Sequence, residues 1–104
     1  MITQLKKGVL ELCVLALLKD EDRYGYELIT LISEEIHVTA GTVYPLLKRI
    51  KAEGYVDHRT VDSPDGPSRK YYSLTERGRA ELDQAVAEWL DFYPRVNTMI
   101  GVQR

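Results

Sequence analysis

The sequence predicts a mainly α-helical fold with a small antiparallel β hairpin and a long C-terminal helix. Three observations support this fold class. Apolar residues recur at helical spacing in three segments before residue 54. Two strand-like segments then flank a stretch rich in Pro, Gly and Asp, which is typical of a hairpin. A further helical apolar stripe follows residue 75, and 104 residues are expected to form a single domain.

The first helix is expected over residues 5–19, where apolar side chains surround almost the whole circumference. Its apolar run at 9–18 is too short to span a membrane and contains Glu11, and it lacks the cleavage site of a signal peptide. We therefore expect a soluble, cytoplasmic protein. Cys13, the single cysteine, is interpreted as a buried, inert thiol rather than a nucleophile.

The second and third helices are expected over residues 24–36 and 39–54, separated by a short turn at 37–38. In the third helix Gly54 is a natural residue to follow the C-terminus. Pro45 leaves two positions open for the helix start. If Thr42 is the N-cap, Pro45 falls in the first turn and costs little; if Thr39 is the N-cap, one backbone hydrogen bond is lost.

The outward face of the third helix suits an approach to duplex DNA. When its apolar stripe points inward, the exposed ridge consists of Gly41, Pro45, Lys48 and Ala52. Hydroxyl groups and cations flank this compact ridge, and both are donors for phosphates. A recognition helix presents its N-terminal part to the major groove. The alternative is a solvated amphipathic helix whose basic residues are simply its wet face.

The hairpin is expected from strands near 55–61 and 69–74, joined by a longer loop at 63–68. Helices followed by such a hairpin give the order of a winged helix-turn-helix, in which the hairpin, or wing, contacts the DNA backbone or minor groove. An ordinary charged hairpin is the alternative. The DNA-binding residues predicted on the helix and the wing are Thr39, Thr42, Tyr44, Lys48, Arg49, Arg69 and Lys70.

The distribution of charge along the chain agrees with a DNA-binding surface on the third helix and the wing. The net charge is −2, but residues 37–79 carry eight Lys/Arg against five Asp/Glu, a local charge of +3. Residues 1–36 carry four against seven, and residues 80–104 carry two against four. The basic part of the chain is therefore the part that holds the third helix and the hairpin.

The last helix carries an apolar seam with heptad spacing, formed by Leu82, Val86, Trp89, Tyr93, Val96 and Ile100. It predicts a homodimer, with residues 1–75 as a DNA-binding domain and 76–104 as a dimerisation helix. Pro94 predicts a kink or break near Tyr93. Two interpretations of Trp89 remain open: packed interface core, or a platform that stacks on a small aromatic or cationic effector.

Residues suited to catalysis are few. His37 and His58 are the only histidines, no set of residues has metal-ligand spacing, and no phosphate-cradling glycine loop is present. Solvent or local hydrogen bonds are expected to satisfy both histidines. The sequence therefore predicts neither an enzyme nor a cofactor or metal site.

Four motifs in order resemble the PadR family of bacterial transcriptional regulators: GVLELCVLALL at 8–18, YGYEL at 24–28, GTVYPLLKRIKAEGYV at 41–56 and GPSRKYYSLTERGR at 66–79. The resemblance implies a winged-helix homodimer that represses transcription and is often relieved by a small molecule. It places Thr42, Tyr44 and Pro45 on the recognition helix, and Arg69 and Lys70 on the wing. Two residues depart from the family pattern, Val43 in the core and Ser68 at the wing tip. The rival interpretation is a winged-helix module that binds protein and not DNA.

Overall fold

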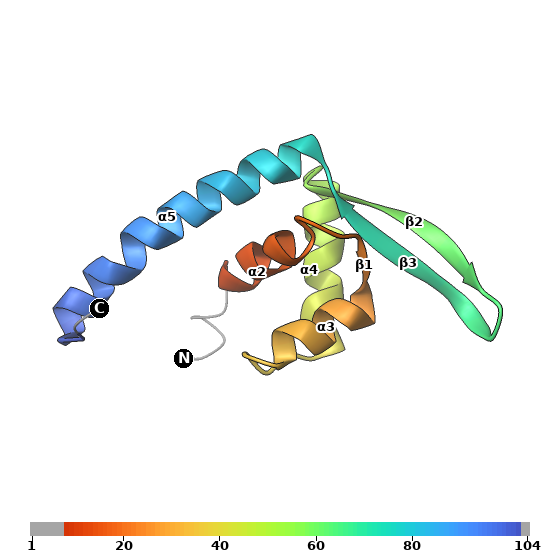
Figure 1. Ribbon diagram of the computed structural model, residues 1–104, viewed down its shortest axis with the longest axis horizontal. Coiled ribbons are helices and arrows are strands. Elements are labelled where there is room, and N and C mark those ends of the chain that lie inside the picture. Colours follow the sequence, from red (N-terminus) through yellow and green to blue (C-terminus); the bar gives the residue numbers. More distant parts are fainter. Residues whose placement is uncertain (1–7, 103–104) are drawn as a thin grey trace.

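The structure, a computed structural model, describes residues 8–102. The elements follow the predicted order, with helices at the N-terminal side, then a hairpin and a long helix (Figure 1). They are α2 (Val9–Leu17), β1 (Arg23–Tyr24), α3 (Gly25–Ser33), α4 (Ala40–Ala52), β2 (Val56–Ser63), β3 (Gly66–Leu74) and α5 (Glu76–Ile100). The hairpin and α5 project in opposite directions from a body formed by α2, α3 and α4, and the long axis measures 53 Å. The predicted fold class is confirmed.

The hydrophobic core lies where α2, α3 and α4 meet the sheet and the first turns of α5. Most of its members are helical residues at the spacing that the sequence indicates, and Val38, Val56 and Tyr72 come from a loop and two strands. They are Leu10, Val14, Leu15, Leu18, Leu28, Ile32, Val38, Val43, Leu47, Ile50, Val56, Tyr72 and Leu82. The predicted first helix begins at residue 5, and its first three residues lie outside the described part of the chain.

The ends of α4 and α5 are capped by local chemistry. Gly54 has a φ of 84°, and the N–H of Tyr55 donates to the carbonyl of Ile50 at 3.0 Å, as in a Schellman motif. The Thr75 hydroxyl accepts from the N–H of Gly78 at 2.9 Å and donates to the carbonyl of Gly54 at 2.6 Å. One threonine therefore starts α5 and ties it to the end of α4.

The sheet contains more than the predicted hairpin. Its strand order is β1-β3-β2, because the two residues of β1 pair with Tyr71 and Tyr72 of β3. The sequence interpretation assigned Tyr24 to a helix and missed this strand, which is too short to show a periodic pattern. The predicted long loop is also wrong: Ser63 pairs with Gly66, so the connection is only Pro64 and Asp65. A register shift between Val61 and Ser63 accompanies this tight turn.

Helix α5 runs unbroken through Pro94 to Ile100, and its ribbon curves along its length (Figure 1). Of the kink or break expected near Tyr93, the break is wrong, because the helix is continuous. The proline removes one hydrogen bond, the one to the carbonyl of Leu90, and this residue is exposed, so water can satisfy the carbonyl. The helix ends at Gly101 in the left-handed region. No helix within residues 8–102 is both long and apolar enough to cross a membrane.

Candidate nucleic-acid interface

The start of α4 presents a polar, compact surface to solvent. Thr39 is the N-cap residue and Ala40 is the first helical residue, so the structure selects the deeper of the two positions considered for Pro45. The carbonyl that loses its partner belongs to Gly41, which is exposed, so water can satisfy it. Thr39 and Thr42 are exposed as well. The first N–H groups of the helix have no acceptor within the helix, so they are available to an anionic partner.

Tyr44 lies on the side of α4 that faces the hairpin. Its side chain is 45 % exposed, and its ring packs against the backbone of Gly25 at the start of α3. Thr42 and Tyr44 are therefore both surface residues, and neither belongs to the hydrophobic core. Behind Tyr44 lies Tyr72, whose pKa is raised by burial and then by the neighbouring Tyr44 phenol.

The two predicted cations of α4 lie in different environments. Lys48 is exposed on the outward ridge and has no ion-pair partner within residues 8–102. Arg49 instead binds two carboxylates, Glu11 of α2 at 2.8 Å and Glu53 at 3.1 Å. Burial lowers the pKa of Arg49, but its hydrogen bonds to these carboxylates outweigh that effect and the pKa is raised. The charge of Arg49 is compensated within the chain, and its predicted role at DNA loses support.

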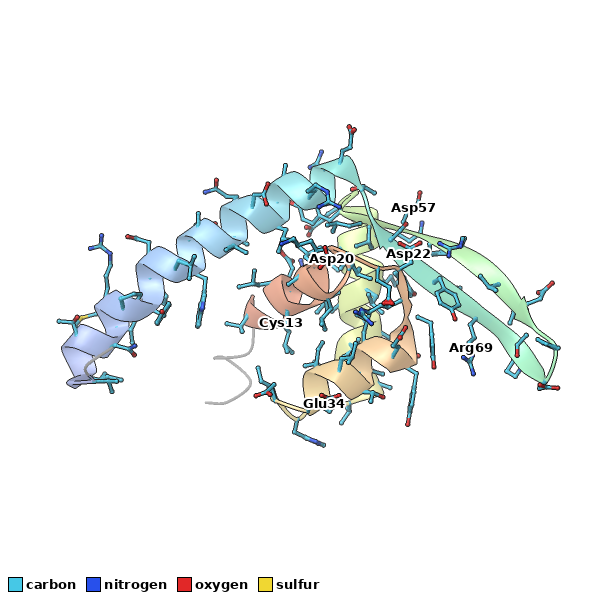
Figure 2. All side chains as sticks on the ribbon, viewed as in Figure 1. Cys13, Asp20, Asp22, Glu34, Asp57 and Arg69 are labelled. Atoms are coloured by element: carbon cyan, nitrogen blue, oxygen red, sulfur yellow. The ribbon has the colours of Figure 1, made fainter. Side chains whose placement is uncertain are left out.

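The wing brings its cations toward the same region. Figure 2 shows the Arg69 side chain extending from β3 on the side of the hairpin that faces α3. Its guanidinium carbon lies 4.5 Å from the centre of the Tyr24 ring, a cation–π contact. In contrast, Arg59 on the partner strand is paired with Asp22. No carboxylate pairs with Arg69 or Lys70 in the described part of the chain.

A shallow pocket of about 400 Å³ forms where the helices meet the wing. Its lining is aromatic, hydroxylated and basic, and contains no carboxylate. The lining residues, called the wing pocket below, are Tyr24, Tyr26, Tyr44, Ser68, Arg69 and Lys70. Three of the seven predicted DNA-binding residues, Tyr44, Arg69 and Lys70, meet here.

Sequence reasoning missed the contribution of Tyr24 and Tyr26. Both fall at the start of the helix expected over residues 24–36, and no role was predicted for them. The available signal was the pattern Tyr-Gly-Tyr itself, because a glycine between two aromatics indicates close approach of another group. The expectation that His58 is satisfied by water or a local hydrogen bond is wrong for one ring nitrogen. Its Nδ1 is buried beside Tyr72 without a hydrogen-bond partner in the described residues.

A second surface lies on α5 and consists of the predicted apolar seam without its first residue, Leu82. Leu82 is only 3 % exposed and belongs to the core of its own chain, which corrects its assignment to a dimer interface. Val86, Trp89 and Tyr93 are exposed or half-exposed, and the Trp89 and Tyr93 rings stack at 5.6 Å. The remaining predicted members are Val96, which is half-buried, and Ile100, which is exposed.

Beside this surface is an open pocket of about 490 Å³ between α2 and α5. Its apolar walls include Leu12 and Trp89, and its rim carries two carboxylates, Glu88 and Asp91. Asp91 already binds Arg95 at 3.1 Å, whereas Glu88 has no ion pair within residues 8–102. The tryptophan that was considered as a ligand platform therefore lines a pocket with an uncompensated negative charge.

Comparisons with known proteins agree with this architecture. The model of the Transcriptional regulator PadR-like family matches residues 14–84. The negative transcriptional regulator PadR of Bacillus subtilis is 30 % identical over 86 residues, which cover 79 % of this chain and 45 % of that protein. The solved structure of a PadR-like transcriptional regulator from Bacillus cereus has 35 % identity and a TM-score of 0.84, covering 96 % of this chain and 99 % of the other.

The X-ray structure of a PadR-like transcription factor from bacteroid fragilis is also similar, with 38 % identity and a TM-score of 0.80 over 93 % of this chain and 95 % of the other. The family match includes α3, α4, the whole hairpin and the start of α5, so it contains every element that forms the wing pocket. The chain belongs to the PadR-like family of transcriptional regulators.

Proposed function

We propose that this chain binds operator DNA as a homodimer and represses transcription until a small aromatic effector releases it. The proposed place of action is the cytoplasm, since the partner is the chromosome. One observation carries the DNA-binding part: the hydroxylated start of α4 and the uncompensated cations of the wing face the same region. The residues proposed to contact DNA are Thr39, Thr42, Tyr44, Lys48, Arg69 and Lys70.

The chemistry of these groups matches the phosphate backbone and the groove edges. Hydroxyls and free N–H groups at the start of α4 are donors, and Lys48, Arg69 and Lys70 supply positive charge. The ridge formed by Gly41 and Pro45 is compact, so the helix can approach the floor of the major groove. Arg49 is left out of this set because Glu11 and Glu53 compensate its charge.

The dimer is proposed to form through α5, from Val86 to Ile100. A row of exposed apolar side chains along one helix is unusual for a monomer of this size, and the seam leaves Val86, Trp89, Tyr93 and Ile100 exposed. A second copy of α5 would cover it. Two wings and two recognition helices would then contact half-sites about 34–36 Å apart, one turn of the DNA helix.

The effector is proposed to stack on Trp89 in the pocket between α2 and α5. Its apolar walls fit a planar ring, and Glu88 at the rim favours a ligand with positive charge. The competing assignment is that the partner helix packs completely against Trp89 and leaves no room for a ligand. Quenching of tryptophan fluorescence by planar cations tests this directly, because Trp89 is the only tryptophan.

A binding assay at several salt concentrations tests the DNA-binding proposal. Fluorescence anisotropy with a duplex from upstream of the gene should give an affinity that falls steeply as salt rises, since phosphate contacts release counterions. Lys48→Ala should weaken binding at every sequence. Lys19→Ala is the matched control, because Lys19 is also exposed but lies in the loop after α2. Binding without salt dependence, or equal loss in both variants, would favour the protein-interaction alternative.

A further inference from the structure

Gly25 occupies a position in which only glycine leaves room for Tyr44. A Cβ at Gly25 would lie 2.5 Å from Cε1 of Tyr44 and 2.9 Å from its hydroxyl oxygen, closer than van der Waals contact allows. The three nearest atoms all belong to this one side chain. Gly25 itself is buried, whereas the Tyr44 side chain is 45 % exposed and can rotate outward. An added methyl group would therefore displace the Tyr44 ring and leave the helices in place.

The residue before Gly25 holds the wing cation. The Tyr24 ring supports the Arg69 guanidinium at 4.5 Å, and the ring of Tyr71 lies 5.4 Å from that of Tyr24. An aromatic face orients a guanidinium without compensating its charge, in contrast to the carboxylates that bind Arg49 and Arg59. Arg69 is therefore fixed in direction and still able to bind an anion.

The segment Tyr24-Gly25-Tyr26 thus sets the position of one hydroxyl from α4 and one cation from the wing. Both lie at the wing pocket, together with the hydroxyl of Ser68 and the ammonium of Lys70. A tetrahedral anion with several oxygens is the ligand that converging hydroxyl, ammonium and guanidinium donors fit. Ser68 also donates to Asp62 at 2.9 Å, so its hydroxyl oxygen remains available mainly as an acceptor and we assign it no contact.

We propose that the wing pocket binds a single backbone phosphate of the operator in each half-site, and that Gly25 and Tyr24 act as positioning residues for it. This inference rests on the proposed DNA-binding function and adds to it a defined phosphate clamp between α4 and the wing. Tyr44 and Arg69 touch the phosphate. Gly25 acts through Tyr44, and Tyr24 acts through Arg69.

The test combines a double-mutant cycle with neutral phosphates. Gly25→Ala should weaken binding to the operator duplex about tenfold, as expected for loss of one hydrogen bond to a charged group. In a Tyr44→Ala background the same change should cost nothing further, because the three nearest atoms that the methyl group would meet are gone. Replacing phosphates one at a time by methylphosphonate should reveal one position per half-site where the wild-type chain loses more affinity than Gly25→Ala does, because the variant keeps only the Arg69 contact.

Tyr44→Phe gives the same test if Gly25→Ala does not fold, because it removes only the hydroxyl. Tyr55→Phe is its matched control, since Tyr55 lies beyond the opposite end of α4 and contacts Arg77. Tyr24→Phe should retain affinity and Tyr24→Leu should lose it, because only the former keeps a ring under Arg69. Equal losses from Gly25→Ala with and without Tyr44, or uniform sensitivity to every methylphosphonate, would overturn the clamp while leaving DNA binding intact. A wild-type chain that does not bind DNA would refute both proposals.

Discussion

Substitution of Leu82 tests whether this residue belongs to the core of a single chain or to the dimer interface, and the structure gives the expected size of the effect. The side chain is 3 % exposed within a single chain, at the junction of α5 with the rest of the core. Truncation of a buried leucine to alanine costs about 2–5 kcal/mol, from lost burial and the cavity that remains. The first turns of α5 are anchored by Thr75 and limit relaxation around the site, so we expect about 3 kcal/mol for Leu82→Ala.

Urea unfolding at two protein concentrations, tenfold apart, measures this effect. For a domain of this size, about 3 kcal/mol corresponds to a fall in Tm of roughly 12–24 °C. The loss should be the same at both concentrations, because Leu82 contacts its own chain. Leu90→Ala is the matched control: the residue lies two turns further along the same helix and is 56 % exposed.

Sedimentation of the same variants completes the test. Leu82→Ala should leave the dimer dissociation constant unchanged under native conditions, whereas loss of Trp89 should weaken the dimer. If Leu82→Ala destabilises the protein by less than 1 kcal/mol, or only at low protein concentration, its assignment to the single-chain core is refuted.

Three further predictions follow from the contacts described above. Thr75→Ala should lower the free energy of unfolding by about 1–2 kcal/mol, since it removes the cap of α5 and the bond to Gly54, and Thr75→Ser should restore most of it in urea titrations. Because the folded-state pKa of Tyr72 is raised above 10.0, stability should fall as pH rises from about 10 through that folded-state value, and Tyr72→Phe should reduce this alkaline loss in thermal melts. Arg49→Ala should cost at most about 1 kcal/mol of stability and change DNA affinity less than Lys48→Ala; an equal loss of affinity would return Arg49 to the interface.

Local sequence patterns were sufficient to predict most of the fold. The apolar stripes of α3 and α4 identify these helices. Gly54 marks the end of α4, and Thr75 marks the start of α5. The change from helical to alternating periodicity marks the wing. These features depend on neighbours within a few residues, so they can be read along the chain. The basic character of residues 37–79 also follows from counting alone.

Contacts between residues far apart in the chain could not be predicted from the sequence pattern. The pairing of Arg23 and Tyr24 with β3 joins segments almost fifty residues apart, and two residues are too few to show a strand period. The ion pair of Arg49 was missed for the same reason. Helical periodicity places Arg49 on the outward face of α4, but only the fold brings Glu11 of α2 close enough to compensate its charge. The heptad spacing of Leu82 and Val86 is equally regular, but only packing against α2 and the sheet shows that the first is core and the second is exposed.

The sequence by itself determined the helices and the hairpin of this regulator, because their formation follows from local spacing and capping. Only the tertiary structure decided which side chains are free to act, because burial, ion pairing and ring contacts join residues from different elements. The fit of the Tyr44 ring against Gly25 and the support of Arg69 by Tyr24 are of this second kind. Both arise where α3, α4 and the wing meet, and that meeting is a property of the folded chain.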